Sequence, residues 1–223
     1  MGLTVRARYW AVAHLTSLAL LAGVAVADDA STHAIGGSAA MESHAKQTMS
    51  GDSDVRRSVA EYTIPDVTMV REDGKSVNLA AELNDGRPVV LNFVYTSCTT
   101  ICPMSSQVFE QFQDELGGAR EAVHLMSISI DPEQDTPARL REYAGRFHAL
   151  KGWNHYSGTL AASLAVQKAF NAYRGDKMSH IPLTLTRAAP GKPWVRFDGF
   201  ARADDLLAER KTWEPAAEAL VAR

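Results

Sequence analysis

An apolar run from Val89 to Tyr95 constrains the fold of this chain more than any other feature. It reads Val-Val-Leu-Asn-Phe-Val-Tyr and does not alternate between apolar and polar residues. Such a run is typical of a strand that is buried on both faces, in a sheet covered by helices on both sides. A helix is predicted to open at Pro103, with one apolar stripe, and to stop at Gly117-Gly118.

The elements predicted around this strand indicate an α/β fold with a central mixed sheet flanked by helices. A small hairpin is expected over residues 64–78, with its turn at Asp73-Gly74. Thr136 and Pro137 indicate the start of another helix. The remaining predicted elements are a strand over residues 125–130, a helix over about 160–173, strands over 181–186 and 194–197, and a last helix from about residue 203.

Residues 1–27 have the three parts of a secretory signal peptide. Arg6 and Arg8 form the basic segment, a mostly apolar stretch follows, and Ala25-Val26-Ala27 supplies the small residues that a signal peptidase recognises. We therefore expect an exported, periplasmic protein. The alternative is an uncleaved segment that anchors the protein to the inner membrane and keeps it close to the membrane surface.

Residues 28–58 are rich in Ala, Ser, Gly, Asp and Thr and lack apolar periodicity, so we predict a flexible linker before one domain over residues 59–223. The linker contains scattered side chains that suit copper, but their irregular spacing favours a plain spacer. These residues are His33, Met41, His44 and Met49.

The composition excludes several classes of function. The 223 residues include only two cysteines, too few for a disulfide framework or a four-cysteine zinc site. The formal net charge is −3 and no basic run occurs, which argues against a nucleic-acid partner. No glycine-rich phosphate loop is present.

Both cysteines, Cys98 and Cys102, lie where the predicted central strand meets its helix. Positions four apart at a helix start face the same side, so the two sulfurs can share one ion or form a disulfide. The helix N-terminus favours thiolate over thiol. A purely structural disulfide is the less favoured interpretation, because so short a loop restrains little chain entropy.

A pair of thiolates is too small a ligand set for structural zinc, whereas Cu(I) accepts two or three ligands and prefers sulfur. One imidazole would complete a three-ligand copper site. His180 is favoured because it precedes the predicted strand over 181–186, and loops at matching ends of parallel strands converge near the cysteines. The other candidates are His124, His148 and His155.

Two segments resemble the motifs of the SCO/SenC family. Residues 93–103 read Phe-Val-Tyr-Thr-Ser-Cys-x3-Cys-Pro, and residues 127–137 read Ser-Ile-Ser-Ile-Asp-Pro-Glu-Gln-Asp-Thr-Pro. The resemblance extends over about residues 60–210. It implies a thioredoxin-like fold, export, and delivery of copper to the dinuclear copper centre of cytochrome c oxidase.

The same resemblance implies site residues. Cys98 and Cys102 match the copper thiolates of the family, and His180 stands where the family places its histidine. Asp131 ends a predicted strand near this site and is a candidate for at most an indirect role.

The chain also departs from the family pattern. Thr99-Thr100 follows the first cysteine where the family often has Pro-Asp, and Ser179 replaces the usual Asp before the histidine. The turn over residues 188–191 lacks the usual acidic residues. Ile181-Pro182 resembles the cis-proline loop that faces the dithiol of thioredoxins. These departures keep both thiols and the imidazole. They favour thiol–disulfide chemistry more strongly than the family pattern alone favours it.

Two functional hypotheses follow. In the first, the protein binds copper through Cys98, Cys102 and His180 and delivers it to the copper-receiving subunit of a respiratory oxidase. In the second, it is a periplasmic thiol–disulfide oxidoreductase in which Cys98 attacks a disulfide and Cys102 resolves it, with a thiol–disulfide reductase as partner. A combined role would reduce the oxidase thiols that later receive copper. We favour copper delivery, because disulfide exchange does not require a histidine.

Overall fold

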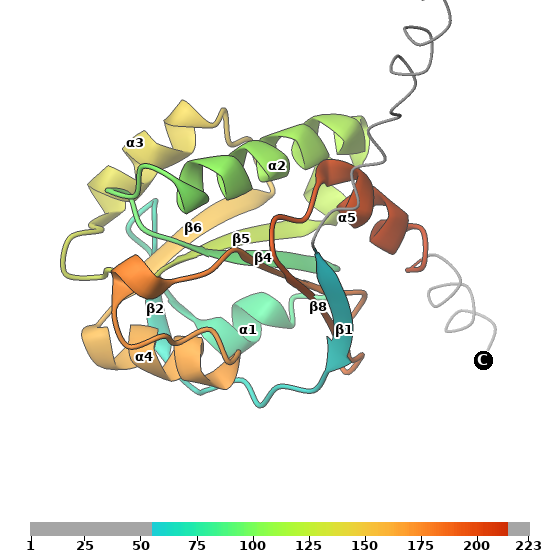
Figure 1. The fold of residues 1–223 in the computed structure, drawn as a ribbon. Helices are drawn as coiled ribbons and strands as arrows, with labels where there is room; N and C mark the ends of the chain where they lie inside the picture. Colours follow the sequence, from blue (N-terminus) through green and yellow to red (C-terminus); the bar gives the residue numbers. More distant parts are fainter. Residues whose placement is uncertain (1–54, 214–223) are drawn as a thin grey trace, which may run out of the picture. The chain divides into compact units, whose positions relative to one another are not determined.

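A computed structural model describes residues 55–213, and an eight-stranded mixed sheet lies at its centre (Figure 1). The strands follow the order β1-β8-β7-β4-β5-β6-β2-β3 across the sheet. Their bounds are β1 (Arg56–Ala60), β2 (Thr68–Arg71), β3 (Ser76–Asn78), β4 (Val89–Val94), β5 (His124–Ser129), β6 (Trp153–Gly158), β7 (Leu183–Arg187) and β8 (Trp194–Asp198).

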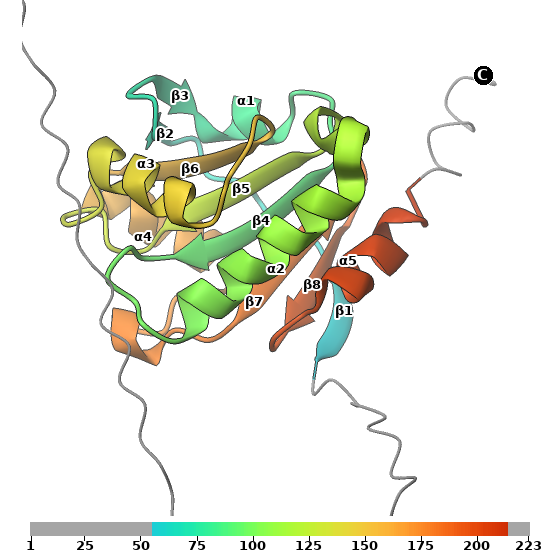
Figure 2. The same cartoon turned by 90° about the horizontal axis from the view of Figure 1, so that it is seen from above.

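Helices cover both faces of this sheet (Figures 1 and 2). One face carries α2 (Ile101–Leu116), α3 (Pro137–Arg146) and α5 (Ala203–Arg210), and the other carries α1 (Leu79–Leu83) and α4 (Leu160–Ala169). Two short 3₁₀ helices, η1 (Gly117–Ala122) and η2 (Lys177–Ser179), complete the described elements. The predicted α/β architecture, a thioredoxin-like fold with a mixed sheet between helices, is confirmed.

The central strand β4 contributes to both cores of the domain. All six of its residues are buried. Val90 and Val94 pack into the core beneath α2, whereas Leu91 and Phe93 pack into the core on the α4 side. The unbroken apolar run therefore marks a strand covered on both faces, as its sequence predicts.

The strand directions bring the start of β7 beside the end of β4. β4, β5 and β6 run parallel to one another, but β7 is antiparallel to β4, with Asn92 opposite Thr184. The segment before β7 therefore meets the segment after β4. The prediction for His180 assumed parallel strands, and this assumption is wrong for β7.

Several element bounds differ from the predicted ones. β1 pairs with β8 and begins at Arg56, so the last three residues of the predicted linker, Arg56–Ser58, belong to the sheet. The edge strand β1 was not predicted, because its Arg-Arg-Ser start gives no alternation of apolar and polar residues. β6 and α1 were not predicted. The signal segment, the linker before residue 55 and the tail after Pro215 lie outside the described residues.

Within residues 55–213, the helices are too short or too polar to cross a membrane.

Candidate metal and dithiol site

Cys102 lies in the first turn of α2, and Cys98 lies in the turn that precedes this helix. The N-cap residue, Thr100, makes no side-chain capping hydrogen bond. Instead, the backbone N–H of Cys102 donates to Sγ of Cys98 over 3.4 Å. The Cys98 sulfur thus occupies the position of a capping acceptor, where the free N–H groups of a helix start stabilise negative charge.

The two thiols have opposite acidities. Burial raises the pKa of Cys98, but hydrogen bonds from the backbone N–H groups of Cys102 and Thr100 outweigh burial and bring it below its ordinary value. Burial raises the pKa of Cys102 well above its ordinary value, against a weaker opposing effect of the Tyr95 N–H. Both cysteines are free thiols in this structure. The pair therefore combines one acidic sulfur with one that remains a neutral thiol.

His180 places one ring nitrogen at the buried thiol. Its Nε2 lies 3.5 Å from Sγ of Cys102, and its Nδ1 lies 3.2 Å from the carbonyl oxygen of Lys177. A carbonyl only accepts hydrogen bonds, so Nδ1 carries the proton, and Nε2 of the neutral ring is unprotonated and presents its lone pair to the Cys102 thiol. Burial lowers the pKa of His180, which keeps the ring neutral. A neutral imidazole with a free Nε2 lone pair is the form that ligates metals.

Tyr95, the first residue after β4, touches every part of the site. Its backbone N–H donates to Sγ of Cys102 over 3.4 Å, and its ring packs edge-on against His180 at 5.4 Å between centroids. Its hydroxyl donates to Sδ of Met178 over 3.5 Å. Burial and a hydrogen bond with the Cys98 side chain raise the pKa of Tyr95 to about 12, so it stays protonated.

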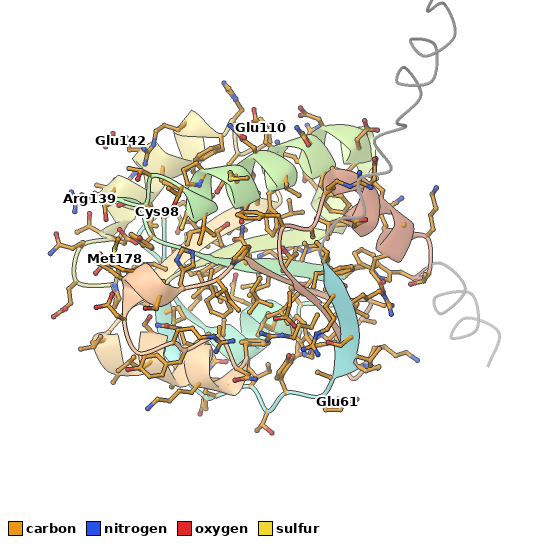
Figure 3. All side chains as sticks on the ribbon, in the orientation of Figure 1. Glu61, Cys98, Glu110, Arg139, Glu142 and Met178 are labelled. Atoms are coloured by element: carbon orange, nitrogen blue, oxygen red, sulfur yellow. The ribbon has the colours of Figure 1, made fainter. Side chains whose placement is uncertain are left out.

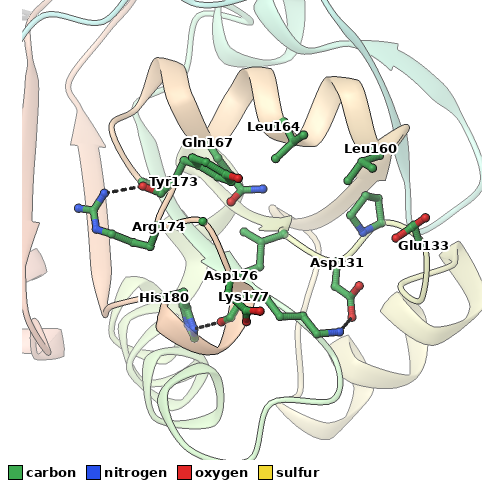
Figure 4. Close-up of a pocket in the computed structure, with 14 residues that line it drawn as sticks. Asp131, Glu133, Leu160, Leu164, Gln167, Tyr173, Arg174, Asp176, Lys177 and His180 are labelled. Atoms are coloured by element: carbon green, nitrogen blue, oxygen red, sulfur yellow. Dashed lines mark hydrogen bonds and ion pairs between the residues drawn. The ribbon is translucent and has the colours of Figure 1, made fainter.

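Asp131 supports the site through Lys177. The two side chains form an ion pair of 2.5 Å between Oδ2 and Nζ, and the carbonyl of the same lysine holds Nδ1 of His180 (Figure 4). Asp131 is 8% exposed and contacts neither cysteine through a hydrogen bond. Its position agrees with the indirect role considered from the sequence.

Asp135 joins the segment after β4 to the end of β5. This fully buried carboxylate accepts hydrogen bonds from the Thr96 hydroxyl over 2.6 Å, from the Thr96 N–H over 3.2 Å and from the Ser129 hydroxyl over 2.6 Å. Sequence reasoning missed this role, although Asp135 lies inside the second motif. The network holds the start of the Cys98 turn against the second motif.

The other three candidate histidines lie away from the thiols. His124 begins β5, at the opposite end of the parallel strands, and contacts the Tyr156 hydroxyl at 2.9 Å. His148 is exposed and pairs with Glu110. His155 is buried in β6, where it stacks on Trp153. Of the four histidines considered, the structure therefore brings His180 to the cysteines.

The donors suit a soft metal ion, although they are not closed around one. In the part of the chain that the structure describes, no three His, Cys, Asp or Glu side chains stand in a preformed metal cluster. Two sulfurs and a neutral imidazole are the donor types that Cu(I) prefers.

The peptide bond between Ile181 and Pro182 is trans, which differs from the cis-proline loop that this dipeptide resembles.

The chain is similar in sequence to known proteins. The SCO1/SenC family model matches residues 56–184. A SCO1 protein homolog of Bacillus subtilis is 31% identical over 98 residues, which cover 44% of this chain and 50% of the relative. The chain thus spans about half the length of this curated relative.

Solved structures share the fold over a larger part of the chain. The copper-bound ScoI of Bradyrhizobium japonicum has a TM-score of 0.58 at 24% identity, covering 68% of this chain and 99% of that protein. BsSco, a member of the Sco family of cytochrome c oxidase assembly proteins in which a disulfide switch was identified, has a TM-score of 0.59 at 25% identity. The likeness covers 70% of this chain and 95% of BsSco. The family model spans more than half of the sequence and includes both cysteines and the second motif, and the chain therefore belongs to the SCO1/SenC family.

Proposed function

We propose that this protein is an exported copper-binding protein that delivers copper to a respiratory oxidase such as cytochrome c oxidase. Copper is its cargo, and Cys98, Cys102 and His180 are the ligands. The observation that carries this proposal is the 3.5 Å contact between Nε2 of His180 and Sγ of Cys102, with Nδ1 engaged by Lys177. Disulfide exchange requires no imidazole with a free lone pair at the buried thiol, whereas copper binding uses one.

The acidity of the thiols sets how the cargo binds. Copper needs both sulfurs as thiolates. Because the pKa of the Cys102 thiol is raised, this thiol keeps its proton in the metal-free protein and releases it when copper binds. Affinity therefore increases with pH. A copper-receiving subunit that offers its own thiolates can take the ion, since Cu(I) readily exchanges between soft ligands.

The direct test is an anaerobic titration of the reduced protein with Cu(I). We expect about one equivalent to bind, in keeping with a single two-thiolate site. The Cys98→Ser/Cys102→Ser double variant should lose this equivalent. His148→Ala is the matched control, because His148 is exposed and lies away from the thiols, and it should bind as the unaltered protein does. Stoichiometric binding by the double variant would contradict the proposal.

A second function, thiol–disulfide exchange, is favoured by the opposite acidities of the two thiols. The Cys98 thiolate would attack a target disulfide, form a mixed disulfide and release one target thiolate. Cys102 would then lose its proton and attack Cys98, releasing the second target thiolate. The protein would end as the Cys98–Cys102 disulfide, having supplied two electrons to the target.

Reduction of a model disulfide separates the two functions. Fast exchange that is unaffected by His180→Ala, together with negligible Cu(I) binding, would support only the oxidoreductase function. Tight Cu(I) binding with slow exchange would support only the copper-binding function. The two activities exclude each other at any moment, because a disulfide between the ligands cannot bind copper through them.

Export is part of the same proposal. The signal-like segment supports cleavage after Ala27, so N-terminal sequencing of the periplasmic protein should begin at Asp28. Full-length protein found only in the inner membrane would instead support the anchored alternative.

A further inference from the structure

Met178 presents a thioether to solvent beside the candidate copper site. It belongs to η2 and is 74% exposed, more than any other large apolar side chain among residues 55–213. By contrast, Cys102 is fully buried, and Cys98 and His180 are 7% and 8% exposed. A copper ion that arrives from solution can therefore contact Met178 before it reaches the three buried donors, Cys98, Cys102 and His180, which we call the inner donors.

Tyr95 joins Met178 to the inner donors. Its hydroxyl lies 3.5 Å from Sδ of Met178, while its backbone N–H contacts Sγ of Cys102 and its ring packs on His180. Met178 and Cys98 also lie on the same side of the domain (Figure 3). The thioether is thus held at the edge of the site.

The segment that carries Met178 is fixed by its own hydrogen bonds. The Asp176 carboxylate accepts from the Met178 N–H over 2.7 Å, and the carbonyl of Lys177 accepts from the backbone N–H of His180 over 3.3 Å. The ion pair between Lys177 and Asp131 balances the positive charge of the residue that precedes Met178 in the chain. A cation that approaches Met178 therefore meets a neutralised lysine.

We propose that Met178 is a transient ligand of Cu(I) as the ion enters and leaves the site. A thioether is soft and selects Cu(I), and it has no proton to lose at the pH of the compartment. This inference rests on the proposed copper function, and it adds an outer donor to the three inner ligands.

The first test measures the rate of copper transfer. The Cu(I)-loaded protein is mixed with an excess of bathocuproine disulfonate, and the coloured copper complex is followed in a stopped-flow instrument. Met178→Leu should slow the transfer by about fivefold or more, with the equilibrium affinity changed by no more than about twofold, because an outer ligand lies on the path and not in the final site. Met104→Leu is the control: Met104 is a second exposed methionine, 50% exposed, two residues after Cys102 in α2, and its replacement should leave the transfer rate unchanged.

The second test observes the thioether itself when the inner site is removed. The Cys98→Ser/Cys102→Ser variant, labelled with carbon-13 at the methionine methyl groups, is titrated with Cu(I) and followed by NMR. The Met178 methyl signal, assigned from its loss in Met178→Leu, should shift, whereas the Met104 signal should not.

The outcomes separate this inference from the function on which it rests. If the unaltered protein binds Cu(I) but transfers it at the same rate with Met178→Leu, the transient-ligand proposal is overturned while the copper function stands. An unmoved Met178 methyl signal overturns it as well. Failure of the unaltered protein to bind Cu(I) overturns the copper function itself.

Discussion

Nε2 of His180 lies 3.5 Å from Sγ of Cys102, although 78 residues separate them in the sequence. The antiparallel pairing of β4 and β7 produces this contact, because the end of one strand lies beside the start of the other. The hydrogen bond from Nδ1 to the Lys177 carbonyl then sets the orientation of the ring. Two segments remote in sequence thus form one site at a single edge of the sheet.

Cys98 should react with alkylating agents before Cys102. The pKa of Cys98 is lowered and that of Cys102 is raised, so as the pH rises Cys98 becomes a thiolate first. Peptide mapping by mass spectrometry after brief iodoacetamide treatment at several pH values should show Cys98 modified at a pH below the ordinary pKa of a cysteine thiol. Modification of Cys102 ahead of Cys98 would show that the acidities are reversed.

Replacing His180 by Ala should weaken Cu(II) binding more than Cu(I) binding. Imidazole suits the divalent ion, whereas two thiolates alone can still hold the soft monovalent ion. We expect a loss of about 100-fold or more for Cu(II) and about tenfold for Cu(I), measured by competition with chelators of known affinity. His148→Ala is the control and should change neither affinity. Equal losses for both ions would contradict the greater role of His180 for Cu(II), and no loss for Cu(II) would place His180 outside the divalent site.

Replacing Asp131 by Asn should weaken Cu(II) binding indirectly. The change removes the ion pair that holds Lys177, whose carbonyl orients His180. Partners that orient a ligand contribute about tenfold to metal affinity. Glu133→Gln changes a neighbouring exposed carboxylate and serves as the control. If both variants bind Cu(II) as the unaltered protein does, the ion pair has no part in orienting His180.

Replacing Asp135 by Ala should destabilise the fold. The change leaves the donors of Thr96 and Ser129 without their acceptor in a buried position, which costs about 2–4 kcal/mol. For a domain of this size, this corresponds to a fall of about 5–10 °C in Tm. Thermal denaturation followed by circular dichroism measures it, with the exposed Asp114→Ala as control. Equal Tm values for the two variants would contradict the network.

The sequence predicted the elements that carry a strong local pattern. The unbroken apolar run of β4, the cysteine pair at the start of α2 and the Thr136-Pro137 start of α3 depend on neighbouring residues, and all three appear in the structure. β6 was missed because Trp153-Asn-His-Tyr-Ser-Gly158 does not alternate between apolar and polar residues, and its polar His155 is buried in the structure.

The contacts that hold the site residues in place could not be predicted, because they join segments that are distant in the sequence. Tyr95 and Met178 are 83 residues apart, and Asp131 and Lys177 are 46 residues apart. No local pattern brings such pairs together. His180 was chosen from the right segment for a partly wrong reason, since β7 runs antiparallel to β4.

X-ray absorption at the copper edge tests the central claim most directly, because it reports the atoms bound to copper. The reduced protein loaded with one equivalent of Cu(I) should show two sulfur ligands and one imidazole nitrogen, and His180→Ala should lose the imidazole contribution while keeping both sulfurs. A spectrum without sulfur ligands, or an imidazole contribution that survives in His180→Ala, would contradict a site formed by Cys98, Cys102 and His180.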